Sequence, residues 1–372
     1  MAAVLGRRRR ARVVAVMAAT AVAGISVTAC SSSASGGGLS PHGSLQHSYQ
    51  ETISRALPSV VEISAGGSTG SGVVFNNRGF IVTNAHVVGN NTRFEVRTSV
   101  ASEAIRARLV GIFAPDDLAV IKAFGKGPGQ LRPVQWANSG KAQVGQIVLA
   151  MGSPYGLSAS VTQGIISATG RTVQGAEIKG KTALLLNALQ TSAAINPGNS
   201  GGALVLLSGK VIGMPTLTGT NPQNGAPAGG IGFAIPANTV RSIASQLISK
   251  GKVTKSGRAS LDIEGETHVN SEHAPDGVAV TRALPGGAAA KAGIKNGDVI
   301  AGIDGHPTPD IAALDNVLAQ FSPGDRVKIE VLRGGNPRQV MARLSNLGSP
   351  PPASAKGKHK PKPKPKPTPS HS

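Results

Sequence analysis

A serine lies among glycines in the segment 196–202, which reads NPGNSGG and could hold a nucleophile at Ser200. Asn, Pro, Gly and Ser also dominate ordinary turns, so the segment alone leaves two interpretations open, a catalytic serine or a flexible turn. A serine nucleophile needs a base to take its proton, an acid to orient the base, and donors for the oxyanion. The rest of the chain must supply them.

His86 is the candidate base, because it follows the apolar run GFIVTNA at 79–85, which is expected to form a strand. The other seven histidines of the chain lie in polar stretches. A strand end would give the imidazole a rigid support. The alternative interpretation is a histidine packed in the core.

Asp117 is the candidate acid, since it directly precedes the apolar run LAVIKA at 118–123. A carboxylate at the end of that strand can point inward toward an imidazole. Its neighbour Asp116 fits a solvated turn residue better.

The glycines around Ser200 indicate how an oxyanion could be held. Gly198 lets its amide turn toward a substrate carbonyl, and the N–H groups of Gly198 and Ser200 are the natural oxyanion hole. Gly201 and Gly202 are expected to let the substrate backbone approach closely.

The 372 residues allow two or three domains, with cores of Val, Ile, Leu and Ala because aromatics make up only 3%. Short apolar runs bounded by Gly, Asn and Pro predict closely spaced strands, and hence a β-barrel or sandwich. The predicted strands are 59–64, 70–75, 79–88, 93–98, 118–123, 146–152, 164–170, 203–209 and 210–216. An amphipathic helix at 238–251 closes this unit, which is expected to span 46–252.

A second, smaller α+β unit is expected at 256–347. It contains a strand at 277–284, a helix-then-strand signal at 288–305, a helix at 310–321 and a hairpin over 325–344. From 348 to 372 lysine alternates with proline, which predicts an extended tail without a core.

The N-terminus predicts export. The basic run Arg7–Arg12 precedes an apolar stretch from Val13 to Ala29, which is the layout of a signal peptide over 1–29. The segment VTAC resembles a bacterial lipobox, so Cys30 is expected to carry a lipid anchor and to begin a Ser/Gly-rich tether over 30–45. An uncleaved membrane helix and a soluble secreted form are the alternatives. All three place the bulk of the chain outside the cytoplasmic membrane, in the cell envelope.

The net charge of +20 does not by itself indicate nucleic-acid binding. Eleven of the 38 cations lie in the N-terminal run and the C-terminal tail, and no basic stripe with interleaved aromatics is visible in the sequence. Attraction to anionic lipid or envelope polymer is favoured instead. No cofactor and no metal are expected.

Five motifs in order, TNAHVV, DLAVIK, GSPYGLSASVTQGIISATGR, LQTSAAINPGNSGGALV and GIGFAIPANTV, resemble the HtrA/DegP family of serine proteases. The resemblance covers about residues 46–347. It implies a mainly β chain, with a chymotrypsin-like double β-barrel followed by a small α+β PDZ domain, and the catalytic residues His86, Asp117 and Ser200. It also implies an ATP-independent endopeptidase that cleaves unfolded or misfolded proteins, as a homotrimer to which Tyr49 and Leu57 could contribute contacts.

The same resemblance implies that the segment before the serine forms the wall of the primary specificity pocket. The residues concerned are Ser192, Ala193, Ala194, Ile195 and Asn196. Small and aliphatic residues there imply cleavage after Val, Ala, Ile or Leu. Ser192 stands where the family usually has Asp, which is expected to alter loop ordering or pocket polarity.

The carboxylate-binding loop of the PDZ unit would be Ser260, Leu261, Asp262 and Ile263, and C-terminal peptides would be its ligands. The family usually has glycine where this chain has Asp262. An aspartate there could repel the terminal carboxylate, so weakened or altered peptide recognition is expected.

Two other functions remain open from the sequence. One is a chaperone or scaffold of the same fold with little proteolysis. The other is an envelope-binding protein that acts through its Lys-Pro tail, although a solvated spacer is the plainer interpretation of that tail.

Overall fold

The computed structural model describes residues 41–99, 103–125, 128–153, 160–178, 181–196, 198–220 and 227–348. The expected signal peptide, Cys30, the first part of the tether and the Lys-Pro tail beyond Gly348 lie outside the described residues. By its contacts the chain divides into two units, Met1–Ser44 and Leu45–Ser372. The folded elements belong to the second unit, apart from the first turn of one helix.

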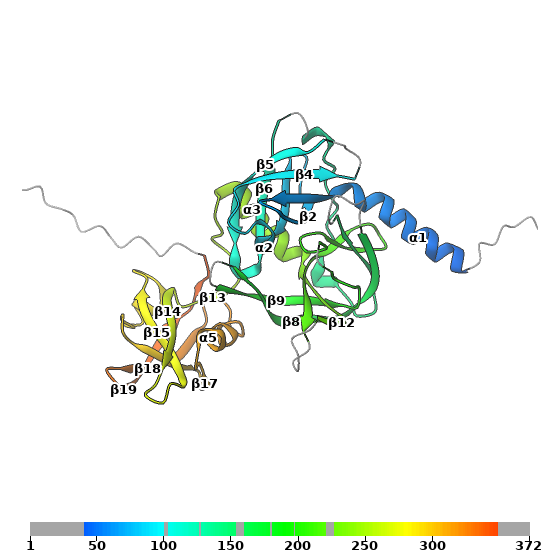
Figure 1. Cartoon of the computed structure of the whole chain (residues 1–372). Coiled ribbons are helices and arrows are strands. Elements are labelled where there is room, and N and C mark those ends of the chain that lie inside the picture. Colours follow the sequence, from blue (N-terminus) through cyan, green and yellow to red (C-terminus); the bar gives the residue numbers. More distant parts are fainter. Residues whose placement is uncertain are drawn as a thin grey trace, which may run out of the picture. The chain divides into compact units, whose positions relative to one another are not determined.

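Six strands close into a first barrel in the order β1-β2-β3-β6-β5-β4 (Figure 1). Their bounds are β1 Val60–Ala65, β2 Ser68–Val74, β3 Phe80–Asn84, β4 Arg93–Thr98, β5 Ile105–Phe113 and β6 Leu118–Ala123. β4 shows why the sequence forms such strands: exposed and buried residues alternate along it, so Phe94 and Val96 enter the barrel core while their neighbours face outward.

Six further strands close into a second barrel in the order β10-β11-β12-β9-β8-β7. Their bounds are β7 Ile147–Gly152, β8 Ser160–Ile178, β9 Lys181–Thr191, β10 Ala203–Leu206, β11 Val211–Thr220 and β12 Pro227–Pro236. The two closed barrels confirm the mainly β, chymotrypsin-like double-barrel prediction. β5, β9 and β12 were not among the strands predicted from the sequence.

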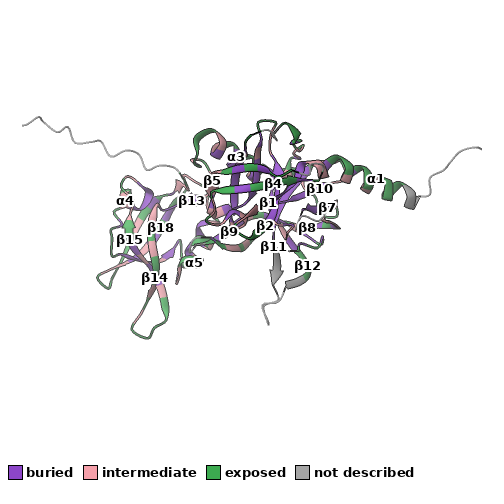
Figure 2. Ribbon diagram, turned by 45° about the horizontal axis from the view of Figure 1, so that its top comes forward, coloured by how far each residue is buried: buried purple, intermediate pink, exposed green. Residues whose placement is uncertain are grey.

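Three α-helices accompany the barrels in the described part of the chain. The helix α3 Ala237–Lys250 confirms the predicted amphipathic helix, and it buries Val240, Ile243 and Leu247. The four-residue helix α2 Ala85–Val88 follows β3 directly. The helix α1 Pro41–Ala56 is largely exposed (Figure 2), and it corrects the expected tether, whose last residues, 41–45, are helical. Tyr49 and Leu57 pack, half-buried, against the core of their own chain.

The PDZ unit is a separate α+β arrangement, as expected. A sheet runs in the order β14-β15-β16-β18-β19, with β17 paired to β16, and a two-stranded sheet joins β13 to β20. Its strands are β13 Ala259–Ser260, β14 Ile263–Val269, β15 Pro275–Ala283, β16 Val299–Ile303, β17 His306–Pro307, β18 Arg326–Arg333, β19 Asn336–Arg343 and β20 Ser345–Asn346. Its helices are α4 Ala288–Lys291 and α5 Ile311–Leu318. A core of its own includes Leu261, Ile300 and Ile329.

Candidate active site

Asp117 lies fully buried at the point where the chain turns from β5 into β6. The turn is the 3₁₀ segment η2 Ala114–Asp116, and Asp117 follows it with a φ of 50°, in the left-handed region that Asp tolerates better than most residues. This backbone turn sends the carboxylate inward. One oxygen accepts a hydrogen bond from the backbone N–H of His86 at 3.0 Å, and the other lies 2.7 Å from His86 Nδ1.

His86 lies in α2 and not at the end of a strand, which corrects the sequence-based expectation, because β3 already ends at Asn84. The rigid support exists nonetheless. The carbonyl of Asp117 accepts hydrogen bonds at 3.0 Å from the amide of Ala85 and from the side chain of Asn84. Because a carboxylate only accepts, Nδ1 donates to Asp117 and leaves Nε2 as the nitrogen that can take a proton.

Thr216 on β11 is a site residue that the sequence analysis missed. Its hydroxyl donates to the same oxygen of Asp117 that contacts Nδ1, at 2.6 Å, and the contact is buried. Its backbone carbonyl accepts a hydrogen bond from the hydroxyl of Ser200 at 3.2 Å. Thr216 therefore links the candidate acid to the candidate nucleophile across the two barrels.

Ser200 is half-buried on the turn before β10, and its hydroxyl is directed to the Thr216 carbonyl. Within the described ranges no hydrogen bond joins Ser200 to His86. The acid and base are thus assembled while the serine holds another partner. For proton transfer the hydroxyl must exchange that carbonyl for Nε2, a contact that often forms only with substrate bound.

The backbone around Gly198 fits a site for an oxyanion. Gly198 has a φ of 101°, which a side chain would strain. The amides of Gly198 and Ser200 have no acceptor among the residues described by the structure. The Gly198 carbonyl accepts a hydrogen bond from the hydroxyl of Ser71, which in turn accepts one from the Ser153 amide at 2.8 Å. This chain of contacts holds the loop while leaving both amides available.

Gly201 and Gly202 pack against backbone in the interior of the protein, which corrects the expectation that they make room for substrate. Both are buried. A Cβ on Gly201 would lie 2.3 Å from the carbonyl oxygen of Ser71, and one on Gly202 would lie 2.2 Å from that of Met151. Glycine is needed at both positions because the turn packs directly on backbone of other strands.

The predicted pocket segment lies beside the serine turn, and the side chain of Asn199 donates to the Ala194 carbonyl at 3.3 Å. Ala193 and Ile195 are buried in the core of the second barrel, whereas Ser192, Ala194 and Asn196 are exposed. The alternation leaves three of the five predicted residues available to line a pocket. The hydroxyl of Ser192 accepts a hydrogen bond from the Ile165 amide at 3.0 Å, which ties the segment to β8.

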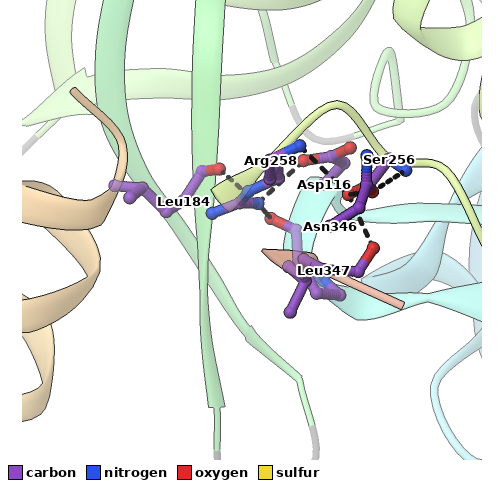
Figure 3. A network of polar contacts seen from close by, with 7 residues as sticks. Asp116, Leu184, Ser256, Arg258, Asn346 and Leu347 are labelled. Atoms are coloured by element: carbon purple, nitrogen blue, oxygen red, sulfur yellow. Dashed lines mark hydrogen bonds and ion pairs between the residues drawn. The ribbon is translucent and has the colours of Figure 1, made fainter. Parts of the chain in front are cut away.

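Asp116 is buried and paired, so its prediction as a solvated turn residue is wrong. Arg258, just before β13, directs one nitrogen to the Asp116 carboxylate at 2.8 Å, to the Pro115 carbonyl at 2.7 Å and to the Leu184 carbonyl at 3.0 Å (Figure 3). Burial raises the pKa of Asp116, and the positive charge and hydrogen bond of Arg258 counteract that rise. Arg258, in the segment that begins the PDZ unit, therefore holds the turn that precedes Asp117.

The same segment is held by the end of the PDZ fold. The Asn346 side chain accepts hydrogen bonds from the amide of Ser256 at 2.8 Å and from its hydroxyl at 3.2 Å. The Leu347 carbonyl accepts a further bond from the Ser256 hydroxyl, and the Leu347 amide donates to the Arg258 carbonyl at 2.8 Å (Figure 3). These bonds join Ser256 and Arg258 to Asn346 and Leu347, and so fix the backbone from which the Arg258 side chain extends.

In the predicted carboxylate loop, Asp262 has a φ of 56°, the region that favours the glycine usual in the family. Its carboxylate accepts hydrogen bonds from the Ala288 amide at 3.2 Å and from the Ser260 hydroxyl at 3.4 Å. The charge thus has one partner at the start of α4 and one on β13. Leu261 is buried in the PDZ core, and Ile263 is half-buried beside it.

Together, two closed barrels, a buried carboxylate paired with an imidazole, and a serine on a glycine-rich turn define a trypsin-like peptidase, followed by a PDZ domain. The model of the trypsin-like peptidase domain matches residues 70–214, and that of the PDZ domain matches residues 259–344. The chain is 36% identical over 291 residues to the serine protease Do-like HtrA of Lactobacillus helveticus, covering 74% of this chain and 68% of that protein. It belongs to the HtrA family of serine proteases.

Other similar proteins are also named as serine endoproteases or HtrA-type proteases. The periplasmic pH-dependent serine endoprotease DegQ of Escherichia coli is 37% identical over 282 residues, and the match spans 74% of this chain and 59% of DegQ. The solved serine endoprotease of Yersinia pestis superposes with a TM-score of 0.53 at 33% identity, over 80% of this chain and 98% of the other. The HtrA-type protease AlgW with a decapeptide gives a TM-score of 0.53 at 30% identity, over 82% of this chain and 99% of that one.

Proposed function

We propose that this protein is a serine endopeptidase of extracytoplasmic protein quality control, which cleaves unfolded or misfolded proteins without ATP. The observation that carries the proposal is the buried Asp117 carboxylate, which binds both the backbone N–H and the Nδ1 of His86. A core histidine would not need this two-point attachment beside a serine turn. The names of the relatives DegQ and HtrA support the same class of activity.

The proposed reaction uses the chain's own groups. Nε2 of His86 takes the proton of the Ser200 hydroxyl as the oxygen attacks the scissile carbonyl. The amides of Gly198 and Ser200 donate to the oxyanion, and one such donor is typically worth about 10²–10³ in turnover. His86 then gives the proton to the leaving amine, and water releases the acyl group by the reverse sequence of transfers.

Substrate preference and peptide binding follow as further parts of the proposal. The exposed small residues Ser192 and Ala194 support cleavage after small or aliphatic residues. C-terminal peptides are the proposed ligands of the PDZ loop, and the peptide-bound AlgW relative supports a peptide ligand in this family. A homotrimer is proposed from the family resemblance, and sedimentation of the purified chain tests it.

The proposed location is the outer face of the cytoplasmic membrane, with Cys30 as the lipid-bearing residue. The periplasmic name of the DegQ relative supports an extracytoplasmic site. In the part of the chain that the structure covers, no helix has the length and apolar character needed to cross a membrane. The intact mass of the mature protein tests the anchor: loss of residues 1–29 with an added diacylglyceryl mass is expected, and retention of those residues would contradict it.

Degradation of unfolded casein tests the activity. The parent chain should degrade it, and Ser200→Ala, which keeps the fold, should not. A chaperone of the same fold is the alternative function, because the Ser200 hydroxyl bonds to the Thr216 carbonyl and not to His86. Suppression of casein aggregation by both forms, with no cleavage by either, would favour that alternative.

A further inference from the structure

The outer face of the first barrel gathers cations that are far apart in the sequence. The strand register places Phe80 of β3 opposite Lys122 of β6, Lys122 opposite Arg108 of β5, and Arg108 opposite Arg93 of β4. The residues next to them along each strand, such as Ile81 and Ile121, are buried in the barrel core, so this row points outward. Figure 1 shows β4, β5 and β6 side by side in cyan.

Two more cations extend this row. Arg106, two residues before Arg108, is exposed on the same face of β5. Arg78 lies just before β3, with its guanidinium carbon 5.4 Å from the centre of the Phe80 ring, while the Lys122 nitrogen lies 4.4 Å from the same centre. We call the set Arg78, Arg93, Arg106, Arg108 and Lys122 the cationic face.

Acids do not balance the cationic face. Glu95 is opposite Arg106 in the register, but its carboxylate forms an ion pair with Arg97 at 3.1 Å. Across the ranges that the structure covers, no ion pair joins a residue of the cationic face to an acid. The positive charge is therefore available to an external partner.

This arrangement does not favour folding. Like charges directly opposite each other on neighbouring strands destabilise a sheet, and both Arg93–Arg108 and Arg108–Lys122 are such pairs. Partial burial lowers the pKa of Lys122, and the charges of Arg78 and Arg108 lower it further. The contacts of Arg78 and Lys122 with the Phe80 ring offset part of this repulsion, but no ion pair in the described ranges offsets it at Arg93 or Arg108.

The layout indicates a broad anionic surface as the partner. The cations spread over three adjacent strands and the turn before a fourth, about 4.8 Å apart from strand to strand, and so match many separate charges better than one bound ion. Aromatic groups accompany them: Phe80 within the row, and Phe124, 43% exposed, whose amide bonds to the Arg106 carbonyl. Basic residues beside exposed Phe are typical of surfaces that settle at the interface of an anionic bilayer.

We propose that the cationic face docks the protease domain onto a membrane rich in anionic phospholipid. The phosphates would lie over the cations, and Phe124 would enter the headgroup region. This contact is separate from a lipid on Cys30, and it would orient the domain as well as attract it. It is also independent of the proposed peptidase activity, because no hydrogen bond or ion pair among the described residues joins the cationic face to His86, Asp117 or Ser200.

The test is flotation of the full chain with vesicles rich in phosphatidylglycerol, against vesicles of phosphatidylcholine alone. The variant Arg93→Gln, Arg108→Gln, Lys122→Gln removes three charges from the face and also relieves the repulsion between strands. It should bind the anionic vesicles about a hundredfold more weakly than the parent chain. The binding of the parent chain should weaken as salt rises.

The matched control is Arg326→Gln, Lys328→Gln, Arg338→Gln, which removes three exposed cations on β18 and β19 of the PDZ unit. Net charge, tail and N-terminus are the same in both variants, so the control should bind as the parent does. Equal losses in both variants would overturn the proposal, because charge alone would then explain binding. Strong binding to soluble polyphosphate that depends on the face, without vesicle binding, would overturn the membrane assignment. Thermal unfolding and peptide hydrolysis of both variants establish that they are folded.

Discussion

At the residue scale, the site depends on how one buried carboxylate is held. Asp117 accepts from the amide of His86, from its ring and from Thr216, so both oxygens are engaged before any substrate arrives. An acid held in this way can fix the imidazole without rearranging during proton transfer. Preorganisation of this kind is where most of the electrostatic contribution to catalysis arises.

Replacing Thr216 by Val tests the third of these contacts. The two side chains have similar shapes, but Val cannot donate to the Asp117 carboxylate, so the imidazole loses part of its orientation. We expect kcat/KM for a peptide to fall about 10–100-fold, with KM little changed. Thr216→Ser, which keeps the hydroxyl, should retain most of the activity. Equal rates for the Val and Ser variants would show that the contact has no part in catalysis.

Most of the candidate site could be predicted from the sequence because short local patterns surround Ser200, His86 and Asp117. Thr216 could not, since a threonine within an apolar strand is ordinary and its role appears only when β11 is placed beside the β5–β6 turn. Asp116 was misassigned for a similar reason. Its partner Arg258 is 142 positions away in the chain, and a solvated turn was the reasonable expectation without it.

At the element scale, the barrel strands with strong β signals were predicted and three other barrel strands were not. β9 contains ALLLNALQ, whose Ala and Leu residues suit a helix equally well. β12 is glycine-rich and has proline at both ends, features that argue against a strand. These segments form strands because closing the barrel pairs their backbone groups, a tertiary effect that a local pattern does not contain.

The η2 turn is an element whose position depends on Arg258. Removing the charge with Arg258→Met would leave Asp116 buried without its partner, and we expect a loss of about 3–5 kcal/mol in the free energy of unfolding. Burial already raises the pKa of Asp116, so the charged form is the unfavourable one in the folded state. The loss should therefore shrink as pH falls and Asp116 takes up a proton.

Denaturant unfolding at several pH values, with peptide hydrolysis measured in parallel, checks this prediction. The double variant Arg258→Met, Asp116→Asn removes the buried charge and should recover much of the stability. If the double variant were as unstable as Arg258→Met at neutral pH, the stranded charge would not be the cause.

The carboxylate loop of the PDZ unit gives a second prediction at this scale. Asp262→Gly removes a negative charge beside the expected site of the ligand carboxylate, and glycine adopts the left-handed φ without strain. Affinity for hydrophobic C-terminal peptides, measured by fluorescence anisotropy, should rise. Asp304→Gly is the matched control, because Asp304 also has a positive φ but lies in a different turn. The affinity of this control variant for the same peptides should not change. Unchanged affinity in Asp262→Gly would mean that the aspartate does not oppose binding.

At the scale of the whole molecule, the fold brings distant segments together in ways that a linear reading does not reveal. The sequence shows no basic stripe with interleaved aromatics, yet the first barrel aligns cations from β4, β5 and β6 beside Phe80. The order of the domains was nevertheless predictable, because the change from short strands to a mixed helix and strand pattern marks the start of the PDZ unit.

Acid stability of the whole chain should depend on Asp298 in the PDZ unit. Its buried carboxylate accepts two hydrogen bonds from Arg333 at 2.7 Å, and these lower its pKa from 3.8. A carboxyl group whose pKa is lower in the folded state stabilises the fold at pH values above its pKa in the unfolded state. That stability is lost as the pH falls through its pKa in the folded state. We expect Asp298→Asn to cost about 1.5–3 kcal/mol at neutral pH, with little difference from the parent in strong acid. Unfolding of both proteins can be followed by circular dichroism. If the difference in unfolding free energy stayed constant from neutral pH to strong acid, this ion pair would not be the source of the acid dependence.

The central claim is that His86, held by Asp117, activates Ser200. Labelling with a fluorophosphonate probe, followed by peptide mapping, tests it most directly, because the probe reacts with a serine only when a base has activated it. We predict one modified residue, Ser200, and loss of labelling in both His86→Ala and Asp117→Asn variants that remain folded. Labelling of a different serine, or undiminished labelling of Ser200 without His86, would contradict the account.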